Sequence, residues 1–349
     1  MKLLVLGGTW FLGRAFVDEA LRHGHEVTTF NRGRSGADVA GAEAIRGDRE
    51  DCASLERLTR GRTWEAVIDT SGYVPRVVYR GAQVLADHAD RYLFVSTVSV
   101  YKRWPIEPLT DESAVLDCPA DVGPEFGTDD PRGYPTQYGF QKAGCECAVH
   151  EVFNERALLV RPGVILGPHE YIGRLPWWLR RIARGGRVLA PGTPNRQIQP
   201  IDVRDVAGFM LTGLEASVAG SFNLAAPIGH ATFGSFLADC IAATGADAEL
   251  VWVDDEFLLE RGVRQWTEIP LWRTFAGTWR VAAARAKAVG LVCRPLSETV
   301  RDTWAWLREG DQAVLHERQG EHGIAPPKEV RLLAAWDAAA RAHGPAPRL

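Results

Sequence analysis

The stretch Lys2-Leu3-Leu4-Val5-Leu6-Gly7-Gly8-Thr9-Trp10-Phe11-Leu12-Gly13 decides the fold of this chain. Residues 2–6 are mostly apolar and predict a buried strand, whereas residues 11–23 repeat apolar side chains at helical spacing. The glycines between the two segments predict a tight turn from the strand into the helix. Because the N–H groups and the dipole at a helix N-terminus favour an anion, this turn predicts a pyrophosphate site. A plain connecting turn is the alternative interpretation.

The spacing of the glycines restricts the kind of nucleotide that this turn can hold. The standard G-x-G-x-x-G spacing is absent, but Gly7 and Gly13 fit the outer positions of G-x-x-G-x-x-G, with Trp10 in the middle position. Gly8 and Gly13 have the spacing of a Walker P-loop, yet Arg14-Ala15 stands where Lys and Ser or Thr are required. We therefore exclude a P-loop nucleotide hydrolase.

Strand and helix patterns alternate outward from this turn through the first half of the chain. Alternation of this kind predicts an α/β fold, a Rossmann-type doubly wound parallel sheet with helices on both faces. Beyond residue 168 the pattern is mostly helical and rich in tryptophan, which predicts a smaller, mostly helical C-terminal lobe. Strands are expected at 2–6, 26–30, 66–69, 92–95 and 157–160, and helices at 11–23, 52–60, 77–89, 137–153 and 330–342.

Composition and charge exclude several classes of protein. The chain has 349 residues, 46% hydrophobic and 24% charged, which is typical of a globular protein and not of a disordered one. Its net charge of −4 gives no basic field for nucleic acid, and it has no apolar run long enough to span a membrane. We expect a cytoplasmic protein with a small-molecule substrate, without a membrane or nucleic-acid partner; a homodimer is left open.

The cysteines predict neither a disulfide framework nor a metal site. Six cysteines are scattered along the chain, so reduced thiols are expected. Cys145, Cys147 and His150 resemble a metal cluster, but positions i and i+2 do not share a helix face and no fourth ligand follows. We therefore expect no metal.

The end of the second expected strand bears on the choice of cofactor. An NAD site usually places Asp or Glu there to bind the ribose 2′-hydroxyl, whereas this chain has Asn31 followed by Arg32 and Arg34. Because an arginine can pair with a 2′-phosphate, the sequence favours NADP(H) and leaves NAD(H) open. A solvated loop is the other interpretation.

The segment Tyr138-Gly139-Phe140-Gln141-Lys142 places a phenol and an ammonium on one helix face, at i and i+4. A phenol is a poor base at neutral pH, but a neighbouring cation favours the phenolate and lowers the pKa. Such a pair can exchange a proton with an alcohol or a carbonyl oxygen. Lys142 is one of five lysines among 40 basic residues, so a chance lysine here is disfavoured.

A run of hydroxyl side chains, Ser96–Tyr101, follows the expected strand at 92–95. Ligands of open α/β sheets bind at such carboxyl ends, so a hydroxyl there could orient a substrate oxygen beside Tyr138. Serine and threonine that only satisfy nearby backbone groups are the alternative.

Taken together, these motifs resemble the extended short-chain dehydrogenases/reductases, the NAD(P)-dependent epimerase/dehydratase family, in a Gly-Gly-Thr-x-Phe-x-Gly variant. The resemblance covers about residues 1–225 and implies hydride transfer between a nicotinamide cofactor and a secondary alcohol or ketone. The product could be an alcohol, a ketone or an epimer, from a sugar, a nucleotide sugar or a secondary metabolite. Its landmarks are the turn at 7–13, Asp48, Ser96–Tyr101, Tyr138 with Lys142, Arg161–Pro168, Gln199–Ala207 and Phe222–Leu224.

The same resemblance implies domains and residue roles. Residues 1–167, with 196–225 returning to them, would bind the dinucleotide, and 168–195 with 226–349 would bind substrate. The catalytic residues would be Thr97, which orients the substrate, Tyr138 as acid/base, and Lys142, which holds the ribose and lowers the tyrosine pKa. The cofactor-binding residues would be Gly7, Thr9, Trp10, Phe11, Leu12, Gly13, Asn31, Arg32, Asp48, Thr70, Ser71, Gly72, Tyr138, Lys142 and Pro162. Six residues are candidates to line the substrate site, although a packing or surface role fits each of them at least as well: His169, Tyr171, Trp177, Arg181, Arg196 and Trp272.

Two departures from the family pattern qualify this prediction. Trp10 replaces a glycine, as it does in a branch that includes chloroplast stem-loop RNA-binding proteins, so a non-catalytic, RNA-associated binding or regulatory protein is the alternative. Sugar-nucleotide dehydratases follow the catalytic threonine with Asp-Glu, where this chain has Val98 and Ser99. We therefore expect no elimination of water.

Overall fold

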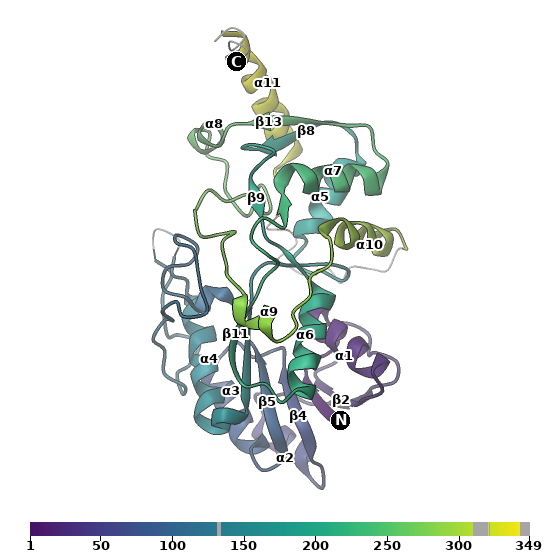
Figure 1. Cartoon of the computed structure of the whole chain (residues 1–349), viewed down its shortest axis with the longest axis vertical. Coiled ribbons are helices and arrows are strands. Elements are labelled where there is room, and N and C mark those ends of the chain that lie inside the picture. Colours follow the sequence, from purple (N-terminus) through teal and green to yellow (C-terminus); the bar gives the residue numbers. More distant parts are fainter. Residues whose placement is uncertain (131–133, 310–319, 321, 343–349) are drawn as a thin grey trace. The chain divides into compact units, whose positions relative to one another are not determined.

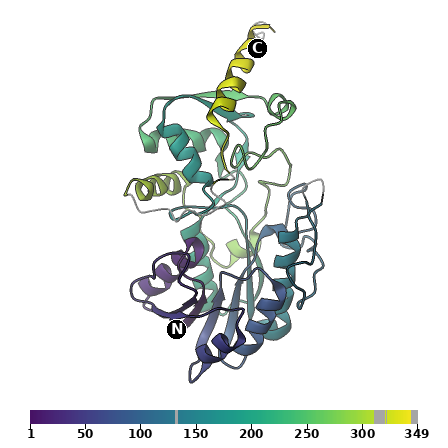
Figure 2. The same ribbon diagram turned by 180° about the vertical axis from the view of Figure 1, so that it is seen from behind.

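A computed structural model describes residues 1–130, 134–309, 320 and 322–342 of the chain (Figures 1 and 2). The chain divides into two compact units. The first unit comprises Met1–Ile165, Gln199–Ile228 and Phe275–Arg294, and the second comprises Leu166–Ile198, Gly229–Thr274 and Pro295–Leu349.

The first unit is built on a seven-stranded sheet in the order β11-β6-β5-β4-β1-β2-β3, with every neighbouring pair parallel. The order reverses between β1 and β4, which is the switch point at which open α/β sheets bind ligands. The doubly wound Rossmann-type fold is therefore confirmed. The strands are β1 (Lys2–Leu6), β2 (Glu26–Asn31), β3 (Glu43–Arg46), β4 (Trp64–Asp69), β5 (Ala89–Val95), β6 (Ala157–Pro162) and β11 (Gly220–Leu224).

Helices cover both faces of this sheet, as Figure 1 shows. Helix α1 (Phe11–Arg22) packs with α6 (Val203–Glu215), and α3 (Pro75–Leu85) packs with α4 (Gln137–Phe153) and α2 (Cys52–Thr59). The central strands are buried and apolar because helices cover them on both sides. Three short helices complete the unit: η1 (Val98–Val100), η2 (Asn154–Arg156) and α9 (Ala284–Ala288).

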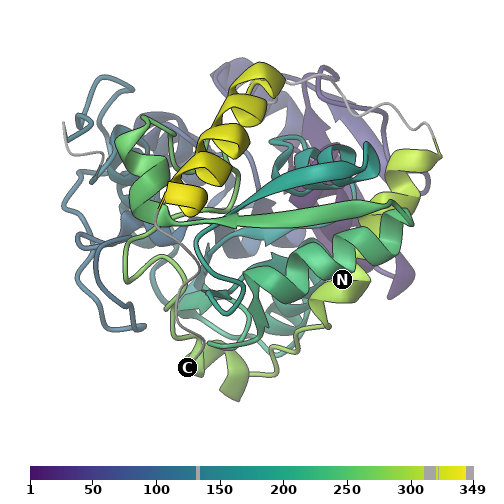
Figure 3. The ribbon, with the colours of Figure 1, turned by 90° about the horizontal axis from the view of Figure 1, so that it is seen from above.

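The second unit has its own small core. Its helices are α5 (Arg174–Ala183), α7 (Phe233–Thr244), α8 (Asp255–Glu260), α10 (Leu296–Arg308) and α11 (Pro326–Ala342), in agreement with a mostly helical lobe. The sequence did not indicate its parallel strand pair, β8 (Gly186–Pro191) with β13 (Ala248–Val253), across which α11 lies in Figure 3. The second unit also contains the two-residue pair of β9 (Gln197–Ile198) with β12 (Ala231–Thr232). In the first unit, β10 (Ile201–Asp202) pairs with β7 (Ile165–Leu166), which begins at the last residue of that unit's first segment.

The described residues bear on the expected membrane and metal partners. None of the helices placed by the structure combines the length and the apolar character needed to cross a bilayer. Within the same described part of the chain, no group of three or more His, Cys, Asp or Glu side chains is arranged to hold a metal ion.

Candidate active site

The glycine turn between β1 and α1 brings the backbone unusually close to the end of β4. Gly7 and Gly8 have φ values of +111° and +91°, which favour glycine. A Cβ on Gly13 would stand 2.8 Å from Thr70 Oγ1 and 3.0 Å from the Gly8 nitrogen, so a side chain there would push α1 off the sheet. Gly7, Gly8 and Gly13 thus form a glycine cradle at the N-terminus of α1, as a pyrophosphate site requires. Trp10, the N-cap of this helix, places an indole side chain in the same turn.

Asn31, at the end of β2, ties this strand to the glycine turn. Its Nδ2 donates to the Gly7 carbonyl at 3.2 Å, while its Oδ1 accepts from the Gly33 nitrogen at 2.8 Å and from Arg46 Nη1 at 3.0 Å. The Asn31 amide therefore already has partners in its own loop. Beside it, Arg32 Nη1 lies 3.9 Å from Asp48 Oδ2, and both side chains are substantially exposed.

The turn after β4 is held against β1 by hydroxyl groups. Thr70 Oγ1 and Ser71 Oγ both donate to the Leu6 carbonyl, at 3.1 and 3.0 Å. Gly72 is packed so closely that a Cβ would lie 2.7 Å from the Phe94 ring. The predicted cofactor residues of this turn therefore lie directly beside the glycine cradle.

Lys142 joins helix α4 to the carboxyl ends of two strands. Its Nζ donates to the Gly72 carbonyl at 2.7 Å and to the Val95 carbonyl at 2.6 Å, and lies 4.1 Å from the centre of the Phe94 ring. The side chain is only 3% exposed, and burial lowers the pKa of the ammonium to about 8. A lysine in this position is held rigidly, which suits a group that must place its charge accurately.

Tyr138 lies one helical turn before Lys142, and its side chain is 44% exposed. Its ring is 6.4 Å from the ring of Tyr73, which itself lies 5.3 Å from Lys142 Nζ. Tyr73 was not predicted, although its place directly after the Thr70–Gly72 turn was a usable signal. The two tyrosines form a partly exposed aromatic surface beside the buried ammonium.

Thr97 follows β5 and caps the short helix η1. Its Oγ1 accepts from the Ser99 nitrogen at 3.2 Å and lies 3.3 Å from Ser99 Oγ, to which it donates. Val98 between them is buried. The structure therefore brings Thr97 and Lys142 to the same end of β5, and Pro162 ends the neighbouring strand β6.

A buried network that the sequence did not reveal supports this region. Arg161 donates to both oxygens of Glu146, at 2.9 and 2.6 Å, and to the Tyr101 hydroxyl at 3.1 Å. The Tyr101 hydroxyl in turn donates to Asn223 Oδ1 at 2.7 Å, so β6, α4, η1 and β11 are joined. Burial raises the pKa of the Tyr101 phenol, which makes this tyrosine unsuitable as the acid/base.

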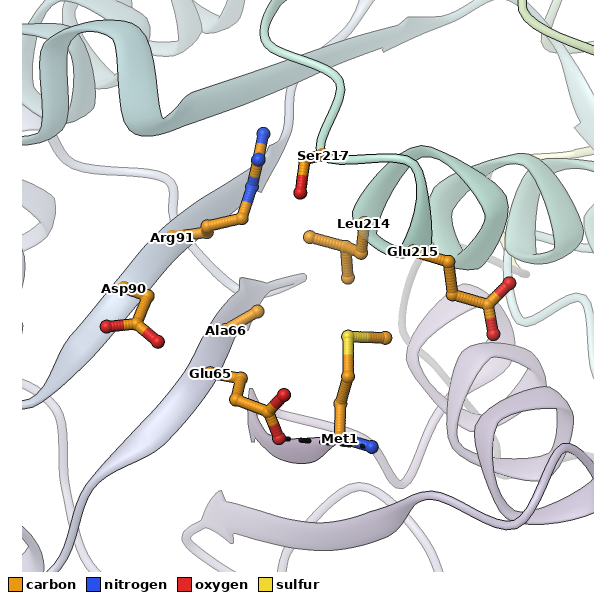
Figure 4. A pocket seen from close by; sticks show the side chains of 8 residues that line it. All are labelled: Met1, Glu65, Ala66, Asp90, Arg91, Leu214, Glu215 and Ser217. Carbon is orange, nitrogen blue, oxygen red and sulfur yellow. Dashed lines mark ion pairs between the residues drawn. The ribbon is translucent and has the colours of Figure 1, made fainter.

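A hollow of about 400 Å³ at the opposite edge of the sheet contains none of the predicted residues. It lies where β1, β4 and β5 begin, beside the end of α6, as Figure 4 shows. Ligands of this fold bind at the carboxyl ends of the strands, so we do not assign the hollow to the active site. Its lining residues are Met1, Glu65, Ala66, Asp90, Arg91, Leu214, Glu215 and Ser217.

Gly139 gives a first test of the site's geometry. A Cβ on it would lie 2.4 Å from the Ser99 carbonyl oxygen, so Gly139→Ala should separate α4 from η1, lower the stability by about 1–3 kcal/mol and reduce turnover. The matched control is Gly208→Ala on α6, where the new Cβ meets no described atom within 4 Å beyond its chain neighbours and the nearby backbone of its own helix. This variant should be neutral or stabilising by up to ~1 kcal/mol. Chemical denaturation measures both, and equal stabilities would contradict the close approach.

Known proteins resemble this chain both in sequence and in fold. A model of the NAD dependent epimerase/dehydratase family matches residues 3–225. A chloroplast stem-loop binding protein of 41 kDa from Arabidopsis thaliana is 24% identical over 265 residues, covering 70% of this chain and 63% of that protein. The match thus spans less than two thirds of the length of this curated relative.

Solved structures share the fold at low sequence identity. The UDP-glucose 4-epimerase of Thermotoga maritima, solved with UDP-glucose, is 19% identical with a TM-score of 0.64, covering 89% of this chain and all of its own. The WbmG enzyme of Bordetella bronchiseptica, solved with NAD and UDP, is 17% identical with a TM-score of 0.66, covering 90% and 97%. A dTDP-glucose 4,6-dehydratase of Bacillus anthracis, solved with NAD, is 14% identical with a TM-score of 0.64, covering 90% and 98%. At these identities the likeness concerns the fold alone.

Proposed function

Because this chain belongs to the NAD dependent epimerase/dehydratase family, as its motifs predicted, we propose that it transfers a hydride between a nicotinamide cofactor and a secondary alcohol or ketone. The observation that carries the proposal is the placement of Tyr138 one turn from the buried Lys142, whose ammonium binds the strand ends beside Thr97. Sugars and nucleotide sugars are the first substrates to test, since the similar solved structures include enzymes that hold UDP-glucose or UDP. Reduction, oxidation and epimerisation are all compatible with this site.

The residues present fit a dinucleotide. The glycine cradle of Gly7, Gly8 and Gly13 would hold the pyrophosphate, and Asp48 with Arg32 would lie by the adenosine. Thr9 and Trp10 belong to the same turn, and Phe11 and Leu12 begin α1. Thr70, Ser71 and Gly72 would pass along the adenosine ribose and pyrophosphate, and Pro162 would line the nicotinamide. When bound, the cofactor supplies or accepts the hydride.

The chemistry of this chain's own side chains is proton transfer and orientation. Tyr138 would give its phenolic proton to a substrate carbonyl oxygen, or take a proton from an alcohol in the opposite direction. Lys142, fixed by the Gly72 and Val95 carbonyls, would favour the phenolate by its positive charge. The Thr97 hydroxyl would orient the substrate oxygen.

We propose that the reaction proceeds without net loss of water. Val98 cannot transfer a proton, and the Ser99 hydroxyl has no useful pKa near neutrality and lies 3.3 Å from that of Thr97. Asp111, an alternative acid, accepts from the backbone nitrogens of Asn223 and Arg285. By mass spectrometry, the product should have the same mass as the substrate after epimerisation. It should be heavier by two hydrogens after reduction and lighter by two hydrogens after oxidation. A product lighter by one water, formed at the full turnover rate, would contradict this proposal.

The cofactor preference is a separate proposal. Asn31 is occupied within its loop and Arg32 lies exposed beside it, so we expect tighter binding of NADPH than of NADH. Arg32→Ala should weaken NADPH binding roughly three- to tenfold and leave NADH binding unchanged. The control is Arg60→Ala, an exposed arginine at the end of α2. Equal or tighter binding of NADH by the wild-type protein would overturn the preference.

The division of labour between the two units is also part of the proposal. The first unit would bind the cofactor, and the second would supply residues for the substrate. Two of the residues proposed to line the substrate site are buried. Arg181 donates a hydrogen bond to Glu329, and the indole N–H of Trp272 donates to Asp255. We therefore assign those two side chains to packing. The cytoplasmic location and the homodimer remain predictions.

A binding or regulatory protein of the RNA-associated type is the second candidate function. The Arabidopsis thaliana relative, named a stem-loop binding protein, favours it, as does Trp10 in the glycine turn. The set of Thr97, Tyr138 and Lys142 argues against it, because a binding protein needs no acid/base pair. The net charge of −4 also disfavours a phosphate backbone as partner.

A further inference from the structure

A buried ion pair lies behind the candidate active site. Arg49 Nη1 donates to Asp69 Oδ1 at 2.6 Å, and Nη2 donates to Oδ2 at 2.7 Å. Asp69, the last residue of β4, is fully buried, and the Arg49 side chain is 14% exposed. Removing two charges from water is costly, and an apolar pair of similar volume would often be at least as stable. Stability alone therefore does not explain why charges occupy this position.

The ion pair is connected to Lys142 through the turn after β4. Asp69 Oδ1 also accepts from the Ser71 nitrogen at 3.0 Å, and Arg49 Nη1 donates to Ser71 Oγ at 3.2 Å. The next residue, Gly72, supplies the carbonyl that accepts from Lys142 Nζ at 2.7 Å. The pair thus fixes the backbone that holds the lysine.

Other ionisable groups also surround Lys142. On α4, burial raises the pKa of the Cys145 thiol to about 12, so it is uncharged near neutrality, and Glu146 is neutralised by the bidentate Arg161 of β6. The ring of Tyr73, which packs beside that of Tyr138, lies 5.3 Å from the ammonium. Tyr92 of β5 donates its hydroxyl to Asp69 Oδ2 at 2.9 Å, and burial raises the pKa of this phenol.

We propose that Arg49 and Asp69 are a positioning pair for the proposed reaction: they fix the turn that holds Lys142, and their opposite charges balance the electrostatic potential at its ammonium. The inference rests on the proposed function, in which that ammonium acts on Tyr138. Neither residue of the pair transfers a proton itself. Both act through Lys142, whose pKa burial already lowers to about 8.

The pair predicts opposite effects for its two single variants. Asp69→Asn leaves the Arg49 cation alone near Lys142 and should lower the lysine pKa further. Arg49→Met leaves the Asp69 carboxylate with Lys142 as its remaining cation and should raise the lysine pKa. General damage to the structure would not shift one titration in two directions.

The chain allows Lys142 to be observed directly, because it contains only five lysines. We would label the lysines with ¹³C, follow the Cε resonances by NMR as the pH rises, and assign Lys142 by its loss in Lys142→Arg. The wild-type lysine should titrate near pH 8, with a shift of about half a unit or more downward in Asp69→Asn and upward in Arg49→Met. Lys102, paired with the exposed Asp117, is the internal control and should not move.

Two further variants test the same electrostatic effect on Lys142 if a single variant fails to fold. Arg49→Lys keeps the charge, and the double variant Arg49→Met/Asp69→Asn removes both charges together. In each, Lys142 should titrate close to the wild-type value. Shifts in the same direction in both single variants, no shift in either, or a shift of about one unit in Arg49→Lys or in the double variant would overturn the proposal.

A parallel titration with NADH and NADPH separates this inference from the proposed function. If the pKa of Lys142 shifts as expected but the wild-type protein binds neither cofactor, the electrostatic effect of the pair on Lys142 is confirmed and the proposed function fails. The pair then has no role in the proposed reaction. If a cofactor binds and Lys142 does not respond, only the positioning role fails. The Lys142 titration needs no substrate, so it can be made before any substrate is known.

Discussion

Replacement of Tyr138 by phenylalanine should reduce turnover by about 10²–10⁴-fold and leave cofactor binding nearly unchanged. The variant removes the hydroxyl that exchanges a proton with the substrate but keeps the ring beside Tyr73. The side chain is 44% exposed, so the change removes little buried surface. We therefore expect the stability of the protein to stay close to that of the wild type.

The matched control is Tyr79→Phe, which removes the hydroxyl of a partly buried tyrosine on α3 outside the catalytic set. Steady-state turnover and nicotinamide fluorescence, measured on both variants, separate chemistry from binding. Near-normal turnover in Tyr138→Phe would remove Tyr138 from the acid/base role. An equal loss in both variants would also count against a specific role.

Replacement of Lys142 by methionine should reduce turnover by a similar factor of about 10²–10⁴ and also weaken cofactor binding. Methionine fills the space but leaves the buried Gly72 and Val95 carbonyls without their donor, at a cost of roughly 1–3 kcal/mol for each. The turn after β4 would then lose its anchor on α4. Loss of both kcat and affinity thus distinguishes Lys142 from Tyr138.

The lowered pKa of Lys142 also predicts how the stability of the protein changes with pH. Burial lowers the pKa of Lys142 from 10.5 to about 8 in the folded protein, so between these values the unfolded chain binds the proton and the folded one does not. The free energy of unfolding should therefore rise with pH across this window. Below pH 8 the buried lysine is charged, and burying that charge destabilises the folded protein. Relative to Lys142→Met, the wild type should gain stability from about pH 8 to 10.5, as denaturation at several pH values measures.

Lys102→Met is the control for the lysine variant, because Lys102 is exposed and pairs with the exposed Asp117. It should change neither turnover nor cofactor binding. An active Lys142→Met protein with normal affinity would show that the buried ammonium is not needed.

The sequence predicted those parts of the molecule that follow from local pattern. The apolar run at 2–6, the glycines after it and the helical stripe at 11–23 lie in the structure as β1, its turn and α1. Tyr138 and Lys142 share a helix because a spacing of four residues is itself a helical contact. The short edge strand β3 escaped prediction because its four residues are mostly exposed and carry no apolar run.

The remaining parts depend on contacts between residues distant in sequence. Arg49 and Asp69 are 20 residues apart, and nothing in their local pattern marks them as partners. The pairing of Arg161 with Glu146 and the approach of Tyr73 to Tyr138 likewise arise only when strands and helices assemble. A charged residue ending a buried strand, as Asp69 does, was the one local signal that could have been used.

The central claim is that the first unit binds a nicotinamide cofactor for use by Tyr138 and Lys142. The most direct measurement is a titration of the wild-type protein with NADPH and with NADH, followed by nicotinamide fluorescence, with a stem-loop RNA titrated in parallel. We predict saturable binding of at least one cofactor, at one site per chain, and no specific binding of the RNA. Saturable binding of the RNA, with no binding of either cofactor, would contradict the account and favour the non-catalytic alternative.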